Sequence, residues 1–389
     1  MPFGVLFALL IGLSSYGNNS HEHFRSLFLA ENFLALGDDL FSVPANEQTL
    51  TEAFGRYDQL LLMLRVNFGI PENKAHELVS EADFAKMTLH ELCTRVPGDA
   101  SANFKKLVTM SIPNKDVSNF EMRQIYVLQE DIRTIWLKNL SKDQLAKVYR
   151  NYFETDPAEN WKEIHISLSA PYLTGEHRWR YELFLEIAQR KYQAKIKSFL
   201  SIHRDKIGQT PVIASELTAI DGIDLTASMF EDNKAKESSK LNTSKNAALE
   251  HIFDWASQNG KEIRIHAFEG ANTGPFYDML ETVLSSYRRP VKIRIGHIGY
   301  LTKEWLERMK KNSFLNVTFD VNAASNYWLQ SRKTADLIEI IKMIHHYGYS
   351  THLGSDGRGI LPKSSYLDQV RTLRTHGFKY MCHKFYLPK

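Results

Sequence analysis

The chain has 389 residues, 43% hydrophobic and 24% charged, which is the composition of a globular protein and excludes a disordered or low-complexity one. Its net charge of +3 is too small, and its basic residues too scattered, to indicate a nucleic-acid partner or an anionic membrane surface. The two cysteines, Cys93 and Cys382, lie far apart, which excludes a CxxC metal site and a disulfide framework.

Residues 1–17 contain an uncharged apolar run from Phe3 to Leu13, which is too short to span a bilayer. The run has the length of a signal-peptide core, and Ser15 to Gly17 would suit cleavage, but no Lys or Arg precedes it. The alternative is an apolar element packed under the fold. The sequence leaves both open, and with them a secreted or a cytoplasmic location.

Two histidines two positions apart, His21 and His23, follow this run. On a strand they would point to the same face, so both imidazoles can reach one ion. A His-x-His pair is a moderately specific metal signal, and it gains weight from further ligands downstream.

Residues from about 30 to 155 are expected to be helical. Leu50–Phe68 and Glu121–Tyr152 have apolar residues at three- and four-residue spacing, with charged faces between them. No candidate ligand lies in this region. We interpret it as a helical insertion that either shapes the pocket entrance or forms the interface of a homodimer.

From residue 162 onward, short apolar runs alternate with helical patterns. Strands are predicted at 162–168, 195–202, 217–226, 264–266, 291–297, 316–321 and 350–356, and helices at 179–192, 247–258, 302–311 and 333–346. The polar stretch 231–246 is predicted to be a mobile surface loop and a candidate lid. With the strand at His21 there are eight strands, which predicts an α/β fold. More closely, it predicts a (β/α)8 TIM barrel over residues 18–389, with a helical insertion between the first and second strands.

Candidate ligands end four of the predicted strands, where the catalytic groups of such barrels gather: His21 with His23, His266, His297 and Asp356. Imidazoles with one carboxylate suit zinc, with a position left open for water whose pKa the metal lowers toward about 7. Glu269, three residues after His266, is placed to carry a proton, and His297 to orient or deprotonate the water. A lone histidine on an apolar strand is more often a core residue, so the prediction depends on the whole group.

Six motifs resemble, in order and rough spacing, those of the adenosine/AMP deaminase family of the amidohydrolase superfamily. They are HEHFRS, GIDLT, HAFEG, RIGH, FDVNAASN and LGSD, where the family reads HxHxxG, DLAG, HAGE, GHG, EVCPxSN and TDDP. The resemblance covers roughly residues 18 to 372. The gap of about 245 residues between His21 and His266 is similar to that of the secreted growth-factor-type deaminases, which carry an early helical insertion.

By this resemblance the metal ligands are His21, His23, His266 and Asp356, and the cofactor is one zinc or other divalent ion per chain. The resemblance also implies that Glu269 is the proton donor to the purine ring nitrogen. His297 matches the histidine that orients the attacking hydroxide.

Three departures fall at positions where the family contacts its substrate. Phe268 stands at the glycine of HAGE, Ala227 near the glycine of DLAG, and Gly357 at the second aspartate of TDDP. Ile298 is also inserted into the GHG pattern. The chemical groups are kept while those that recognise adenine are altered, so we expect plain adenosine to be a poor substrate.

We therefore expect a metal-dependent hydrolytic deaminase of a purine-like nucleoside or related aminated heterocycle. Its partner would be a small-molecule substrate, with no nucleic acid and no membrane span. The alternative is a catalytically inactive deaminase-like protein that binds a ligand or a partner. The retention of Glu269 favours the enzyme, because a purely structural metal site has no use for a proton carrier.

Overall fold

The structure is a computed structural model that describes the following ranges of the chain. These ranges are 20–23, 48–110, 117–154, 163–173, 175–193, 195–204, 207, 220–226, 242–269, 275–329, 332–354 and 366–378. The predicted N-terminal segment 1–17 lies outside them, as do Ala227, Asp356 and Gly357. The side chains of His21 and His23 lie outside the described part as well.

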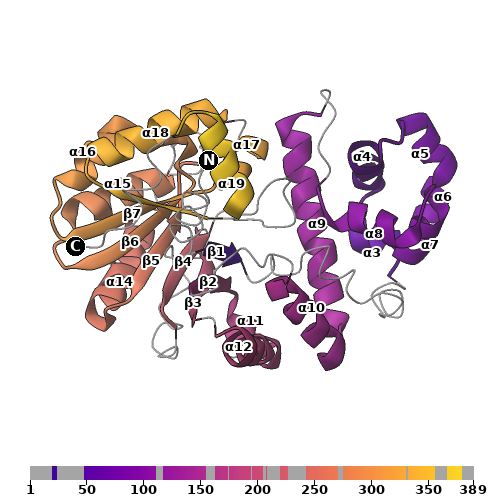
Figure 1. Cartoon of the computed structure of the whole chain (residues 1–389), viewed down its shortest axis with the longest axis horizontal. Coiled ribbons are helices and arrows are strands. Elements are labelled where there is room, and N and C mark those ends of the chain that lie inside the picture. The colour runs from indigo at the N-terminus through magenta and orange to yellow at the C-terminus, as the bar shows by residue number, and fades with distance from the viewer. Residues whose placement is uncertain are drawn as a thin grey trace, which may run out of the picture.

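The strands form one sheet of eight, and their order in space follows their order in the sequence (Figure 1). Every described ladder is parallel. The strands are β1 (Ser20–His23), β2 (Glu163–Leu168), β3 (Lys195–His203), β4 (Gly222–Thr226), β5 (Glu262–His266), β6 (Val291–Gly296), β7 (Leu315–Val321) and β8 (Ser350–Leu353). The prediction of an α/β fold with eight parallel strands is confirmed.

The sheet is curled, because side chains of strands that are not neighbours meet across one face. Ser167 of β2 contacts Asp224 of β4, and Nη2 of Arg264 on β5 lies 3.2 Å from Nδ1 of His165 on β2. In a flat sheet β2 and β5 would be about 14 Å apart. The curled sheet is consistent with a TIM-like barrel. In the described part of the chain no ladder joins β8 to β1, so closure of the barrel stays a prediction.

Helices alone follow β1 in the described residues until β2 begins. They are α3 (Leu50–Phe54), α4 (Tyr57–Phe68), α5 (Glu72–Leu78), α6 (Glu81–Phe84), α7 (Leu89–Arg95), α8 (Ala100–Val108), α9 (Asn119–Asn139) and α10 (Lys142–Glu154). Capping boxes begin four of them, at Thr49, Ser80, Thr88 and Ser118, where the side chain bonds a backbone N–H of the first turn. The helical stretch 50–68 is divided at Gly55, whose φ of 69° ends α3.

Helices α3 to α8 lie away from the sheet, and α9 and α10 stand between them and it (Figure 1). Aromatic side chains hold these layers together. Trp136 of α9 packs on Phe104 of α8 with ring centroids 4.4 Å apart. Tyr152 and Phe153 of α10 pack on Phe184, with centroids 6.3 and 5.5 Å away. Phe184 belongs to α12 (Arg178–Tyr192), the second helix after β2, so α10 joins the helical layer to the sheet side of the molecule.

The remaining helices cover the outer face of the sheet. They are α11 (Ala170–Leu173), α12 (Arg178–Tyr192), α14 (Asn242–Asn259), α15 (Pro275–Ser286), the 3-10 helix η7 (Ile298–Tyr300), α16 (Lys303–Lys310), α17 (Ala323–Trp328), α18 (Thr334–His346) and α19 (Tyr366–Thr375). One hydrophobic core of buried Ile, Leu, Val and aromatic residues lies between α14 to α19 and β3 to β8. The buried residues of α11 and α12 belong to a second core, which they share with β2 and helices α3 to α10. No helix in the described ranges is long and apolar enough to cross a membrane.

Three predicted boundaries are wrong. The strand predicted over 217–226 begins only at Gly222, because the described residues 220 and 221 are not part of it. The prediction of a loop over 231–246 fails at its end, because α14 begins at Asn242; residues 227–241 lie outside the described ranges. The strand predicted to reach Asp356 ends at Leu353. Gly354 still donates its N–H to the carbonyl of Val321 on β7. Its own carbonyl accepts a hydrogen bond of 2.9 Å from the side-chain amide of Gln369 on α19 and, among the described residues, not from the backbone of a neighbouring strand.

Candidate active site

The central histidines stand side by side at the carboxyl edge of the sheet. His266 is the last residue of β5, and His297 directly follows β6. In the ladder between these strands His266 pairs with Gly296, so the two imidazoles leave the sheet at the same level. Their ring centroids are 4.9 Å apart, and the side chains are 7% and 4% exposed.

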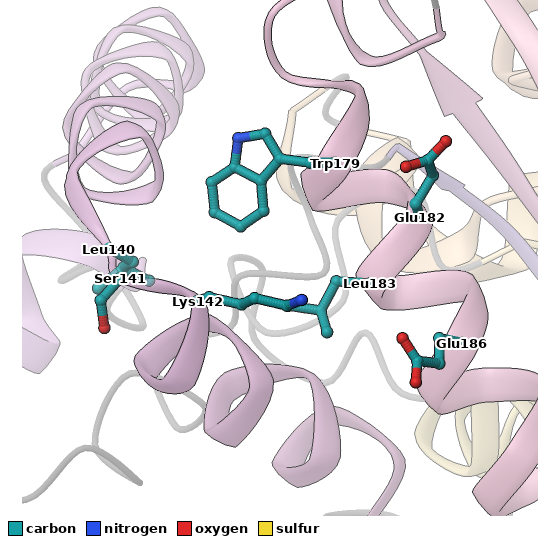
Figure 2. Close-up of a pocket in the computed structure, with 7 residues that line it drawn as sticks. All are labelled: Leu140, Ser141, Lys142, Trp179, Glu182, Leu183 and Glu186. Carbon is teal, nitrogen blue, oxygen red and sulfur yellow. The ribbon is translucent and has the colours of Figure 1, made fainter.

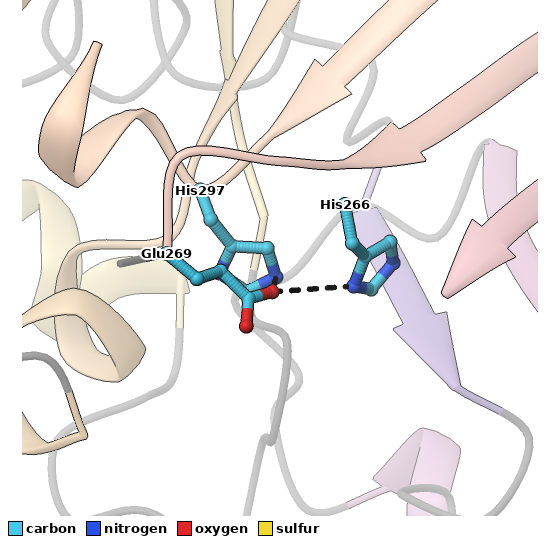
Figure 3. Close-up of side chains that lie close together, drawn as sticks. All are labelled: His266, Glu269 and His297. Atoms are coloured by element: carbon cyan, nitrogen blue, oxygen red, sulfur yellow. Dashed lines mark ion pairs between the residues drawn. The ribbon is translucent and has the colours of Figure 1, made fainter. Parts of the chain in front are cut away.

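Glu269 completes this cluster from the loop after β5. Its Oε1 atom lies 3.1 Å from Nε2 of His297 and 3.6 Å from Nδ1 of His266 (Figure 3). Each of the three residues offers a ligand atom, and these atoms all lie within 4.8 Å of one another. Imidazole nitrogen and carboxylate oxygen are ligands that zinc accepts, so the chemistry of the cluster fits a divalent cation.

The charges of the cluster depend on one another. Burial raises the pKa of Glu269, but His297, His266 and Arg204 outweigh it and hold this pKa below its usual range. Burial lowers the pKa of His266, whereas Asp224 and Glu269 raise it, to about 10 on balance. Glu269 is therefore an ionised carboxylate, and a cation that uses His266 must displace a proton from it.

The backbone before Glu269 is left-handed at a bulky residue. Phe268 has a φ of 61°, which is unfavourable for an aromatic side chain. Its N–H donates to Oη of Tyr277 at 2.8 Å, and its carbonyl accepts from the N–H of Tyr300 at 3.0 Å. The ring is fully buried against Tyr277 and Trp305, with centroids 5.8 and 5.4 Å away. Its bulk therefore contributes to the core under α15 and α16, and a contact with substrate stays a prediction.

Asp224 of β4 is a site residue that the sequence reasoning did not select. It is fully buried, and its Oδ1 lies 3.2 Å from Nε2 of His266. Its other oxygen accepts the hydroxyl of Ser167. The signal was present in the sequence, because Asp224 is a lone carboxylate between Ile223 and Leu225 in an otherwise apolar strand.

A charged layer spans β5, β6 and β7, at and below the level of His266 in the ladder. It consists of Arg264, Arg294, Glu262 and Asp320, in which Nε of Arg294 is 3.2 Å from Glu262 and its Nη1 3.7 Å from Asp320. Burial lowers the pKa of Arg264, as does Arg294, to about 10. Burial also raises the pKa of Asp320. TIM-barrel interiors are usually filled by branched apolar residues, so the sequence pattern of the strands did not predict this layer.

A cavity of about 540 Å³ lies away from the His266, Glu269 and His297 cluster, between the start of α10 and α12 (Figure 2). Trp179, Lys142 and two glutamates line it. The glutamates are engaged by neighbours on their own helix: Glu182 lies 2.8 Å from Arg178, and Glu186 2.7 Å from Arg190. The cavity therefore offers no acid, base or metal-ligand group comparable with those at the strand ends.

The residues predicted from the sequence to bind the metal, carry protons or contact substrate, apart from Phe268, divide into three groups. His266, Glu269 and His297 are brought together. For the His-x-His pair the backbone alone is described: it forms β1, and His23 is in register with Ser167. Asp356, Ala227 and Gly357 lie outside the described ranges, so their roles stay predictions.

No protein-family model matches the chain, and no curated protein matches it. Solved structures give low similarity. An amidohydrolase from Burkholderia ambifaria with bound zinc has a TM-score of 0.43 and 12% identity, over 91% of this chain and 78% of that one. The N6-methyl-AMP deaminase of Arabidopsis thaliana has a TM-score of 0.48 and 14% identity, over 94% and 88%. The Arabidopsis ADAL complex with GMP has a TM-score of 0.47 and 14% identity, over 93% and 88%. All three TM-scores are below 0.5.

Proposed function

We propose that the chain is a metal-dependent hydrolytic deaminase of a purine-like nucleoside or a related aminated heterocycle. The observation that carries the proposal is the buried cluster of His266, Glu269 and His297 at the carboxyl edge of a parallel sheet. That edge is where barrel enzymes keep their catalytic groups. The order of the six deaminase-like motifs supports the same reaction.

The residues proposed to hold one zinc or other divalent ion are His21, His23, His266 and Asp356. Three imidazoles and a carboxylate are a usual donor set for zinc in hydrolases. The position of His266 at the end of β5, beside a second imidazole and a carboxylate, supports this assignment. When bound, the ion supplies a water that is acidic enough to lose its proton near neutral pH.

The proton-transfer role belongs to Glu269 in this proposal. Because the carboxylate is ionised and lies against His297, it must accept a proton before it can donate one to a ring nitrogen. His297 would orient the attacking water. Asn322 lies beside this ring, 3.5 Å from both of its nitrogens.

The domain organisation is part of the proposal. Residues 18–389 would form one barrel, closed between β8 and β1, with a helical insertion over about 30–155. The absence of a strand between β1 and β2 in the described residues supports this insertion. It would shape the entrance for a small-molecule substrate or form a homodimer interface.

The substrate is proposed to differ from adenosine, because Ala227, Phe268 and Gly357 depart from the family pattern. The competing proposal is an inactive protein that uses the same pocket to bind a ligand or partner. The buried Glu269, which is not among the four proposed metal ligands, favours the enzyme, because a structural site made of those ligands has no use for a proton carrier. Release of ammonia from aminated purines and pyrimidines by the zinc-loaded protein distinguishes the two.

A further inference from the structure

The two ring nitrogens of His266 have different neighbours. Nδ1 faces Glu269 at 3.6 Å, on the side of the cluster where His297 lies. Nε2 faces the carboxylate of Asp224 at 3.2 Å, on the opposite side of the ring. Asp224 lies on β4, which pairs with β5, so its carboxylate contacts His266 from the neighbouring strand.

The carboxylate of Asp224 is itself held in place. It is fully buried on β4, and the oxygen that does not face His266 accepts the hydroxyl of Ser167 from β2. Ser167 is 4% exposed, so the chain of contacts from Ser167 through Asp224 to His266 is closed to solvent. A buried contact of this kind fixes the position of the carboxylate and with it the ring that it faces.

A carboxylate opposite one nitrogen of an imidazole decides which nitrogen carries the proton. The proton stays on the nitrogen that donates to the carboxylate, and the other nitrogen presents its lone pair. Metal-binding histidines are commonly oriented in this way, which also raises their basicity. In His266 the proton would sit on Nε2, and Nδ1 would present the lone pair toward the cluster.

We propose that Asp224, supported by Ser167, is a positioning residue that sets the orientation and tautomer of His266 for a divalent cation. The inference rests on the proposed metal-dependent function. Asp224 does not touch the cation or the substrate in this account. Its effect is therefore on the affinity of the site for the metal rather than on the fold.

The first experiment measures zinc affinity of the full chain by competition with a chromophoric chelator. Asp224→Asn keeps the size of the side chain and removes its charge, and we expect it to bind zinc about 10- to 100-fold more weakly. Asp221→Asn is the matched control on the same segment. Its carboxylate accepts the N–H of Ser198 at 2.9 Å, next to the start of β4, and does not touch His266. It should bind zinc as the wild type does.

Ser167→Ala is the milder second variant, because it removes only the hydroxyl that supports Asp224. We expect zinc binding about 2- to 10-fold weaker, in the same direction as for Asp224→Asn. Thermal unfolding of the metal-free proteins separates this effect from general damage. A positioning role predicts that zinc affinity falls further than any change in metal-free melting temperature explains.

The absorption spectrum of the cobalt-substituted protein tests whether Asp224 is a ligand instead. A positioning residue leaves the number of ligands unchanged, so Asp224→Asn should keep the visible band pattern of the wild type. Wild-type zinc affinity in both variants, or a cobalt spectrum that signals a lost ligand in Asp224→Asn, would overturn the inference. If the wild type itself bound no zinc, the proposed function would fail, which is a different result.

Discussion

Oε1 of Glu269 lies 3.1 Å from Nε2 of His297, and both side chains are only 4% exposed. The contact joins two loops that leave neighbouring strands, and the backbone is left-handed at His297 and at Phe268, the residue before Glu269. Neither is a glycine, so the surrounding packing must hold a conformation that is unfavourable in itself. The geometry of the cluster is therefore maintained by the core behind it.

Glycine should be tolerated better than alanine at Phe268. Both substitutions remove a buried ring, but glycine also relieves a left-handed conformation that costs about 1–2 kcal/mol in other residues. We expect Phe268→Gly to unfold at a higher denaturant concentration than Phe268→Ala. Phe319 is the matched control, because it is equally buried on β7 and is not among the residues with positive φ.

At Phe319 the order should be reversed, with glycine worse than alanine, because a strand interior gains nothing from glycine. Chemical denaturation of the four variants gives both differences. The same order at the two positions would mean that the left-handed backbone at Phe268 carries no strain.

The metal should depend on His266. We expect about one equivalent of zinc per chain in the wild type and loss of most of it in His266→Ala, because the alanine variant lacks one of the four proposed ligands. His76→Ala, whose side chain is half exposed on α5, should keep the metal. Elemental analysis of the purified proteins decides it, and equal metal in all three would remove His266 from the site.

Stability should fall in acid partly because of His352. Burial lowers the pKa of this imidazole, as do Arg294 and Arg264, to about 3. The unfolded chain binds its proton near pH 6.5, so stability is fully present above that pH and is lost as the pH falls toward 3. The ring is partly exposed, and we expect about 0.5–1 kcal/mol per pH unit after screening.

His352→Gln removes this titration. The stability difference between wild type and variant, measured by denaturation at several pH values, should shrink or change sign in favour of the variant as the pH falls below 6. Parallel profiles would show that His352 has no part in the acid sensitivity.

Much of the fold is predictable from the sequence. The runs 291–297 and 316–321 alternate apolar residues with polar or charged ones, which is the spacing of a strand, and β6 and β7 lie within one residue of their predicted limits. The end of β8 was not predictable, because it depends on Gln369, which arrives from α19. A contact of that kind has no local signal.

The residues of the candidate site were predictable from the sequence where the side chain itself can bind a metal or transfer a proton. His266, Glu269 and His297 stand out because imidazole and carboxylate groups follow apolar strands. Asp224 and Ser167 were missed, because their role arises only when the curled sheet brings β2 and β4 together. The direction of the Phe268 ring was not predictable from the sequence, because the ring packs on Tyr277 and Trp305, which come from α15 and α16.

Adenosine should be a poor substrate. An unmatched polar group costs about 1–3 kcal/mol, and Gly357 has no side chain to pair with a ring nitrogen. We expect a kcat/KM for adenosine below the range of good enzymes, about 10⁴–10⁸ M⁻¹s⁻¹. Gly357→Asp should shift selectivity toward adenosine in steady-state assays, and an efficient wild-type reaction with adenosine would show that these substitutions do not matter.

The central claim is that Glu269 carries a proton in a metal-dependent deamination, and ammonia release by zinc-loaded protein tests it most directly. Across a panel of amino-purines and amino-pyrimidines, the wild type should release ammonia from at least one. Glu269→Gln should keep its zinc and lose about 10²- to 10⁴-fold in rate. Glu281→Gln, the same change at a partly exposed residue of α15 paired with Arg308, should react like the wild type. No ammonia from any substrate, or an undiminished rate in Glu269→Gln with its zinc retained, would contradict the account.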